Sequence, residues 1–161
     1  VLPPSRYDND ILNDKLVFTD EELQSGGKPV TVYLAKLQGQ PTAAVFETVS
    51  PKGYSGPIYL MVGVNVNGTI SGVRVLSHKE TPGLGDAIDH KHSDWLTGFQ
   101  NKSLSNPSHD RWAVKRDGGD FDQFTGATIS PRAVVNSVRD TLSWFLQHRV
   151  DLFPSLQETV R

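Results

Sequence analysis

The segment Ile58-Tyr-Leu-Met-Val-Gly-Val-Asn-Val66, followed by Asn67-Gly68 and then by Thr69-Ile-Ser-Gly-Val-Arg-Val-Leu-Ser77, has the pattern of a β-hairpin. Both runs are rich in β-branched residues, which favour strands. Asn-Gly is the preferred pair of a two-residue type I′ turn, because both turn positions need positive φ. The runs 30–37 and 42–49 flank Gln38-Gly-Gln-Pro41 and predict a second hairpin. The two hairpins together indicate an antiparallel sheet.

One strong helix is predicted over residues 131–149. Its apolar positions recur at helical spacing and comprise Val134, Val135, Val138, Leu142, Phe145 and Leu146. We expect Ser130 to cap this helix and Pro131 to take its first position, where a missing N–H costs nothing. Short helical pieces over 86–92 and 93–99 and a short strand over 112–116 are expected before it. The predicted fold class is α+β, one antiparallel sheet of hairpins with helices packed on it.

The composition excludes several classes of protein. The chain has 161 residues, which suits a single domain, and its formal net charge of −2 argues against nucleic-acid binding. It contains no cysteine, so disulfides, thiolate metal sites and iron–sulfur ligation are excluded. No metal site is expected either, because His90 and His92 are spaced i, i+2 and would not share one helix face. The sequence has no Gly-x-Ser-x-Gly elbow, which argues against a serine hydrolase, and no Gly-x-Gly-x-x-Gly loop, which argues against nicotinamide binding.

A hydroxyl on a glycine-containing turn precedes the predicted helix. The turn is Asp122-Gln-Phe-Thr-Gly-Ala-Thr128, and the backbone N–H groups and the positive dipole end of the helix should lie close to Thr128. This arrangement is typical of a phosphate site, and the phosphate could be attached to the threonine itself. The alternative is a purely structural turn in which Thr128 caps the helix and binds no ligand.

Two segments carry a resemblance to a known family. Asp122-x-x-Thr-Gly-Ala-Thr128 resembles the flavinylation motif of the FMN-binding domain family, and His78-Lys-Glu-Thr-Pro-Gly-Leu-Gly85 resembles its second signature. The resemblance implies that FMN is joined through its phosphate to Thr128 by a flavin transferase that recognises Asp122. It also implies cofactor contacts from further residues, namely Thr125, Gly126, Ala127, Glu80, Thr81, Gly83, Leu84, Gly85, Lys115 and Tyr54.

Individual roles follow for the residues of the second signature. Leu84 is expected against the face of the flavin ring, and Thr81 with the N–H groups around Gly83 at its pyrimidine edge. Glu80 would either orient the loop or end in a salt bridge. Lys115 lies near the family position of a basic residue beside the flavin, although the adjacent Arg116 could align there instead. Tyr54 and Lys52 are expected to border the ring.

The resemblance extends over most of the chain and is to the RnfG branch of the family, with the homologous NqrC branch of the sodium-pumping quinone reductases as the alternative. It implies an electron-transfer subunit of a membrane-bound ion-translocating oxidoreductase, on a path linking ferredoxin and NAD, with no substrate-turnover site of its own. Residues 1–15 would be a tether that follows a removed N-terminal anchor helix in the inner membrane. Residues 16–161 would be a single periplasmic domain that contacts the other subunits. A non-redox scaffold module remains the other alternative.

Overall fold

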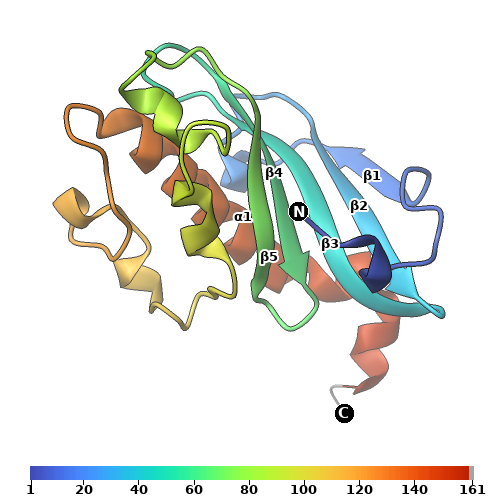
Figure 1. The fold of residues 1–161 in the computed structure, drawn as a ribbon. Coiled ribbons are helices and arrows are strands. Elements are labelled where there is room, and N and C mark those ends of the chain that lie inside the picture. The colour runs from blue at the N-terminus through green and yellow to red at the C-terminus, as the bar shows by residue number, and fades with distance from the viewer. Residues whose placement is uncertain (160–161) are drawn as a thin grey trace.

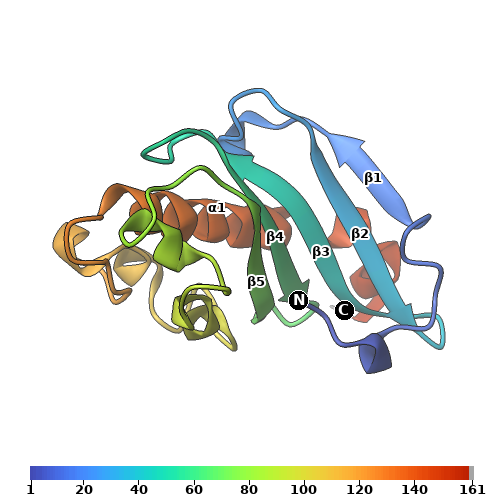
Figure 2. The same cartoon turned by 45° about the horizontal axis from the view of Figure 1, so that its top comes forward.

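The computed structural model describes residues 1–159, which form a five-stranded antiparallel sheet in the order β1-β2-β3-β4-β5 with one long helix on one face (Figures 1 and 2). The elements are β1 (Lys15–Phe18), β2 (Val30–Leu37), β3 (Gln40–Ser50), β4 (Ile58–Asn65), β5 (Ile70–Ser77) and α1 (Ile129–Leu152). The α+β class predicted from the hairpins and the final helix is therefore confirmed.

The core lies between the sheet and α1. Alternate residues of β4 point toward the helix and are fully buried, as the two-residue period of a strand requires (Leu60, Val62 and Val64). Phe46 of β3 packs edge-on against Trp144 and Phe145 of α1, with ring centroids 5.8 and 6.4 Å apart. This packing fixes α1 across β3 and β4, so the position of the helix start is set by the sheet.

Both predicted hairpins are present, but the type I′ turn lies in the other one. Gln38 and Gly39 have φ values of 52° and 79° and join β2 directly to β3. In the β4–β5 connection only Gly68 has positive φ, at 90°, and the Gly68 N–H donates to the Asn65 carbonyl. The Asn67 side-chain oxygen accepts from the Thr69 N–H, a local Asx bond that competes with the predicted turn.

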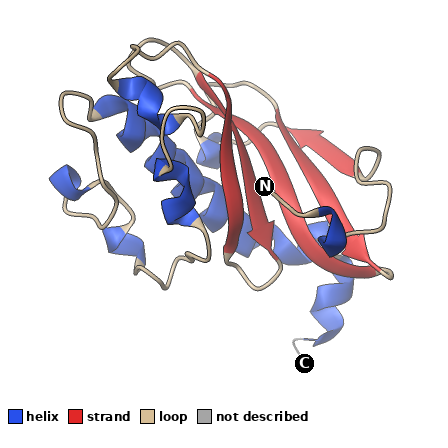
Figure 3. Cartoon of the chain, viewed as in Figure 1, coloured by secondary structure: helices blue, strands red, loops and turns tan. Residues whose placement is uncertain are grey.

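The chain between β5 and α1 contains short 3₁₀ helices joined by loops, and it lies beyond the β5 edge (Figure 3). These helices are η3 (Gly85–Ile88), η4 (Trp95–Phe99), η5 (His109–Arg111) and η6 (Lys115–Asp117). The strand expected over 112–116 is wrong, since only a single bridge joins Val114 to Phe121. The chain reverses at Gly118, where φ is 91°, and a Cβ at Gly119 would overlap the Ala113 backbone, so two glycines set this path.

The first residues of the chain are hydrogen-bonded to the sheet. The Asp8 N–H donates to the Lys36 carbonyl, the Asn9 side chain bonds the Leu34 carbonyl, and the Thr42 hydroxyl donates to the Arg6 carbonyl. The role of residues 1–15 as a tether stays a prediction. Within residues 1–159 we find no helix with the length and apolarity needed to span a bilayer.

Candidate functional site

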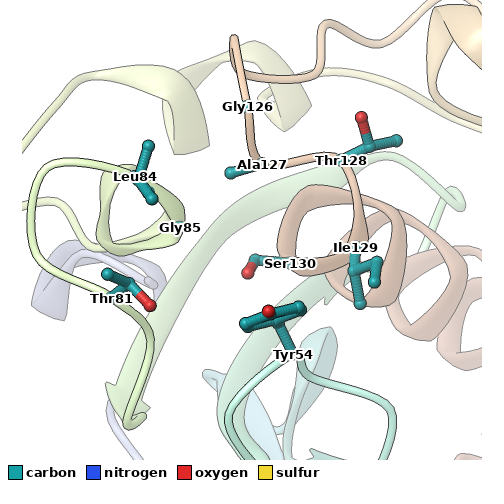
Figure 4. A pocket seen from close by; sticks show the side chains of 9 residues that line it. All are labelled: Tyr54, Thr81, Leu84, Gly85, Gly126, Ala127, Thr128, Ile129 and Ser130. Atoms are coloured by element: carbon teal, nitrogen blue, oxygen red, sulfur yellow. The ribbon is translucent and has the colours of Figure 1, made fainter.

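The two sequence motifs meet at a cleft of about 370 Å³ beside the start of α1 (Figure 4). Three segments supply its walls: the loop after β3, the loop after β5, and the turn that leads into α1. The lining residues are Tyr54, Thr81, Leu84, Gly85, Gly126, Ala127, Thr128, Ile129 and Ser130. The chain thus brings together seven of the residues expected to hold the cofactor, and adds Ile129 and Ser130.

Thr128 occupies the N-cap position of α1 but does not cap it. A capping hydroxyl needs an extended backbone, whereas Thr128 has φ −91° and ψ −30° and its side chain makes no capping hydrogen bond. Its carbonyl accepts the first intrahelical bond, from the Arg132 N–H. The N–H groups of the first turn have no acceptor within the helix, so the Thr128 hydroxyl lies beside the positive end of the helix dipole.

The expected helix start is wrong by two residues. Ser130 lies inside the first turn of α1 rather than at its cap, and Pro131 follows it within the helix. The Ser130 hydroxyl instead donates to the carboxylate of Glu80 at 2.6 Å, so a tertiary hydrogen bond replaces the local one. A serine followed by proline suits a helix cap as well as it suits the first turn, so the sequence pattern alone could not identify the helix start.

The turn before Thr128 closes over the loop of the second motif. The Ala127 N–H donates to the Phe124 carbonyl, and Gly126 adopts a φ of 75°. A Cβ placed on Gly126 would lie 3.6 Å from the Leu84 side chain, so the space between the two motifs here is about that of one carbon atom. Thr125, in the same turn, is exposed and does not line the cleft.

Glu80 lies behind the cleft and not in it. Its side chain is 5% exposed and accepts hydrogen bonds from the Tyr54 and Ser55 N–H groups, both at 2.8 Å, besides the one from Ser130. Of the two roles left open for Glu80, the structure favours orientation of the loop over a salt bridge. Gly83 is absent from the cleft lining and has a φ of 78°, which shapes the loop.

Lys115 and Asp122 pair with each other outside the cleft. Their side chains are exposed and lie 2.7 Å apart, and the hydrogen bond to Asp122 raises the pKa of Lys115. Neither residue lines the cleft. Lys52 lines a neighbouring polar cleft of about 150 Å³ on the other side of Ile129, where its ammonium donates to the Gln24 side chain.

The rim of the larger cleft is apolar and open to solvent. Tyr54, Leu84 and Ile129 are 70%, 43% and 42% exposed. The lining contains no acid, lysine, arginine or histidine. Among the described residues no group of three His, Cys, Asp or Glu side chains is placed to hold a metal ion. The cleft is therefore suited to a flat, largely apolar molecule with a few polar edge atoms.

Comparison with known proteins places the cleft inside a defined family region. The sequence model of the FMN-binding domain matches residues 53–143, which include every lining residue. The chain is 46% identical to the G subunit of the ion-translocating oxidoreductase complex of Pseudoalteromonas atlantica, over 98% of this chain and 74% of the relative. It is 53% identical to the G subunit of the same complex from Escherichia coli, over 86% of this chain and 66% of the relative. For the G subunit of Vibrio cholerae the identity is 47%, over 94% of this chain and 72% of the relative.

Proposed function

Because the chain belongs to the FMN-binding domain family, we propose that it carries FMN covalently, through a phosphoester between the flavin phosphate and the hydroxyl of Thr128. One observation carries this proposal: Thr128 stands at a helix start without capping it, on the rim of the cleft that both motifs form. A purely structural threonine at this position would be expected to use its hydroxyl as a cap. The hydroxyl is instead available for modification beside N–H groups that favour a phosphate.

The attachment needs help from another protein. A secondary alcohol is a poor nucleophile, and no acid or histidine lines the cleft to act as its base. We therefore assign the activation of Thr128 to a flavin transferase and its metal ion. Asp122 is then the residue by which the transferase recognises the turn, since its side chain is exposed and six positions ahead of Thr128.

The cleft suits the flavin ring. Its volume of about 370 Å³ and its apolar side chains fit a ring face, while the Thr81 hydroxyl and the loop backbone provide polar groups for a ring edge. FMN, once bound, supplies one-electron chemistry, which the protein tunes through contacts and exclusion of water. Leu84, and with it Tyr54 and Ile129, would shield the ring faces. The same lining has no carboxylate, histidine or lysine to act as the general base of an independent substrate site.

The similarity to these G subunits extends the proposal to a complex. We infer that the chain acts as an electron-transfer subunit of an ion-translocating oxidoreductase of the Rnf type, on a path that links ferredoxin and NAD. Its partners would be the other subunits of that complex. An anchor helix would hold this domain at the periplasmic face of the inner membrane. The NqrC-type alternative is less favoured, because the similar proteins described above are all G subunits.

Co-expression with a flavin transferase tests the covalent link. After denaturing gel electrophoresis the protein band should fluoresce as flavin, since a phosphoester survives unfolding and a merely bound cofactor does not. A band without fluorescence, from protein that was folded and exposed to active transferase, would favour the non-redox scaffold alternative.

Replacing Asp122 with alanine should abolish flavin attachment without unfolding the domain. Asp122 is exposed and its ion pair is with exposed Lys115, so we expect a stability loss within about 1 kcal/mol. Intact mass after co-expression measures the loading. Asp120→Ala is the matched control, because Asp120 pairs with Arg111 in the same region and should load normally. Normal loading of Asp122→Ala would show that the transferase does not need Asp122 and that this residue only shapes the turn.

Replacing Leu84 with alanine should leave the adduct in place and expose the ring to water. Leu84 is a wall of the cleft and is already partly exposed, so its truncation removes shielding more than stability. The measurement is flavin fluorescence and its quenching by iodide, with Leu76→Ala, an exposed leucine on β5, as control. Identical spectra and quenching for Leu84→Ala and wild type would show that Leu84 does not contact the flavin ring.

A further inference from the structure

A single buried carboxylate joins all three walls of the cleft. Glu80 Oε1 accepts from the Tyr54 N–H at 2.8 Å and from the Ser130 hydroxyl at 2.6 Å, and Oε2 accepts from the Ser55 N–H at 2.8 Å. Tyr54 and Ser130 themselves line the cleft, and so does Thr81, the neighbour of Glu80 in the chain. Each wall therefore has a lining residue that is either hydrogen-bonded to this carboxylate or adjacent to Glu80 in the chain.

These three hydrogen bonds stabilise the carboxylate. A buried anion is costly unless it is paired or fully hydrogen-bonded. Among the described residues no lysine or arginine forms an ion pair with Glu80, so the two backbone N–H groups and the serine hydroxyl offset its desolvation. A glutamine could not replace it, because an amide has one acceptor oxygen and its NH₂ would face a backbone N–H donor.

The backbone at Glu80 is held from the other side by a histidine. The Glu80 N–H donates to His78 Nδ1 at 3.0 Å, so the ring proton lies on Nε2, which is 3.3 Å from the carboxylate of Asp89. Burial by itself would raise the pKa of Asp89, but hydrogen bonds from the Lys91 N–H and from His78 outweigh it and lower the pKa. Asp89 is the residue that directly follows η3, so His78 links the start of the loop from Glu80 to Gly85 to the far end of the helix that follows it.

We propose that Glu80 is the positioning residue of the flavin cleft: its carboxylate sets the separation of the three walls and thereby the environment of the ring. This inference rests on the proposed attachment of FMN to Thr128. Glu80 is not one of the residues that line the cleft. It acts through Tyr54, Thr81 and Ser130, which do line the cleft. The buried carboxylate thus has a role separate from covalent attachment, which depends on Thr128 and Asp122.

The decisive variant is Glu80→Gln in protein co-expressed with a flavin transferase. We expect full covalent loading by intact mass, lower fluorescence anisotropy of the attached flavin, and a reduction potential that differs from that of wild type. Glu47→Gln is the control, because Glu47 also accepts a hydrogen bond, from Tyr33, but lies on β3 away from the cleft. Ser130→Ala removes one of the three bonds and should change both flavin signals in the same direction by a smaller amount.

Amide hydrogen exchange tests the hydrogen bonds to the Glu80 carboxylate without any flavin. In protein prepared without transferase, the Tyr54 amide or the Ser55 amide should exchange about tenfold faster in Glu80→Gln, because the single amide oxygen leaves one of the two N–H groups without its acceptor. Unchanged anisotropy and potential in loaded Glu80→Gln would overturn the proposal. If that variant does not fold, unchanged flavin signals in Ser130→Ala would overturn it. Absence of covalent flavin from the wild type would instead contradict the attachment at Thr128. The exchange measurement would then still test whether the Glu80 carboxylate holds the Tyr54 and Ser55 amides.

Discussion

Thr128→Ala is expected to lose all covalently bound flavin while the domain stays folded. The hydroxyl is the proposed attachment atom, and it makes no capping bond to α1, so its removal should cost no more than about 1 kcal/mol of folding free energy. Flavin fluorescence of the denatured protein and intact mass measure the loss. Circular dichroism and thermal unfolding check the fold.

A threonine outside the motif provides the control for this variant. Thr97 of η4 is exposed and lies outside both the cleft and the Asp122–Thr128 motif, so Thr97→Ala should load fully. Thr128→Ser keeps a hydroxyl at the same place and should retain at least part of the flavin. An adduct that persists in Thr128→Ala while Thr97→Ala loads normally would contradict the assignment of the attachment atom.

Gly85→Ala should have the largest effect on the shape of the cleft. A Cβ on Gly85 would overlap the Ser130 hydroxyl and would lie 3.2 Å from Glu80 Cβ. The loop would have to move away from α1, which breaks the Glu80–Ser130 hydrogen bond. We expect a loss of roughly 1–3 kcal/mol, the usual cost of overpacking at a buried position.

Chemical denaturation and flavin fluorescence measure this effect. Gly98→Ala is the matched control, because Gly98 lies in η4 and a Cβ there would meet no atom within 4 Å. A Gly85→Ala variant with wild-type stability and an unchanged flavin signal would show that the loop tolerates displacement and that its contact with α1 does not shape the ring site.

Much of the fold could be predicted because its signals are local. Strand-forming runs and the helical spacing from Val134 to Leu146 identify the sheet and α1 without reference to other parts of the chain. The errors arose where a tertiary or side-chain bond overrides a local preference. Ser130 bonds Glu80 instead of capping α1, and Asn67 bonds Thr69 instead of adopting positive φ. In place of the strand expected at 112–116, the chain turns through η6, and the backbone of Ala113 and Lys115 bonds the backbone of Phe121.

The site was predictable in part. The structure brings the two motifs together, so Thr81, Leu84, Gly85 and Thr128 lie in one cleft with Tyr54. Their spacing in the sequence does not dictate this meeting, which depends on how β5, η3 and the start of α1 pack. Ile129 and Ser130 were missed as lining residues, although they directly follow the Thr128 motif.

Other expected site residues lie beside the cleft. Lys115 pairs with Asp122, Thr125 is exposed, and Glu80 is buried behind the walls. Their cofactor contacts stay predictions. A charged residue near a motif can pair with a neighbour, stay in solvent or support a wall from behind, and only packing decides among these.

Peptide mapping of the flavinylated protein tests the central claim most directly. After co-expression with a flavin transferase and proteolysis, fragmentation should locate one FMN, added with the loss of one water, on Thr128 of the peptide that contains Asp122-Gln-Phe-Thr-Gly-Ala-Thr128. The account predicts that no other residue carries the adduct. An adduct on Thr125 or Ser130, or an unmodified Thr128 in protein that has turned yellow, would contradict it.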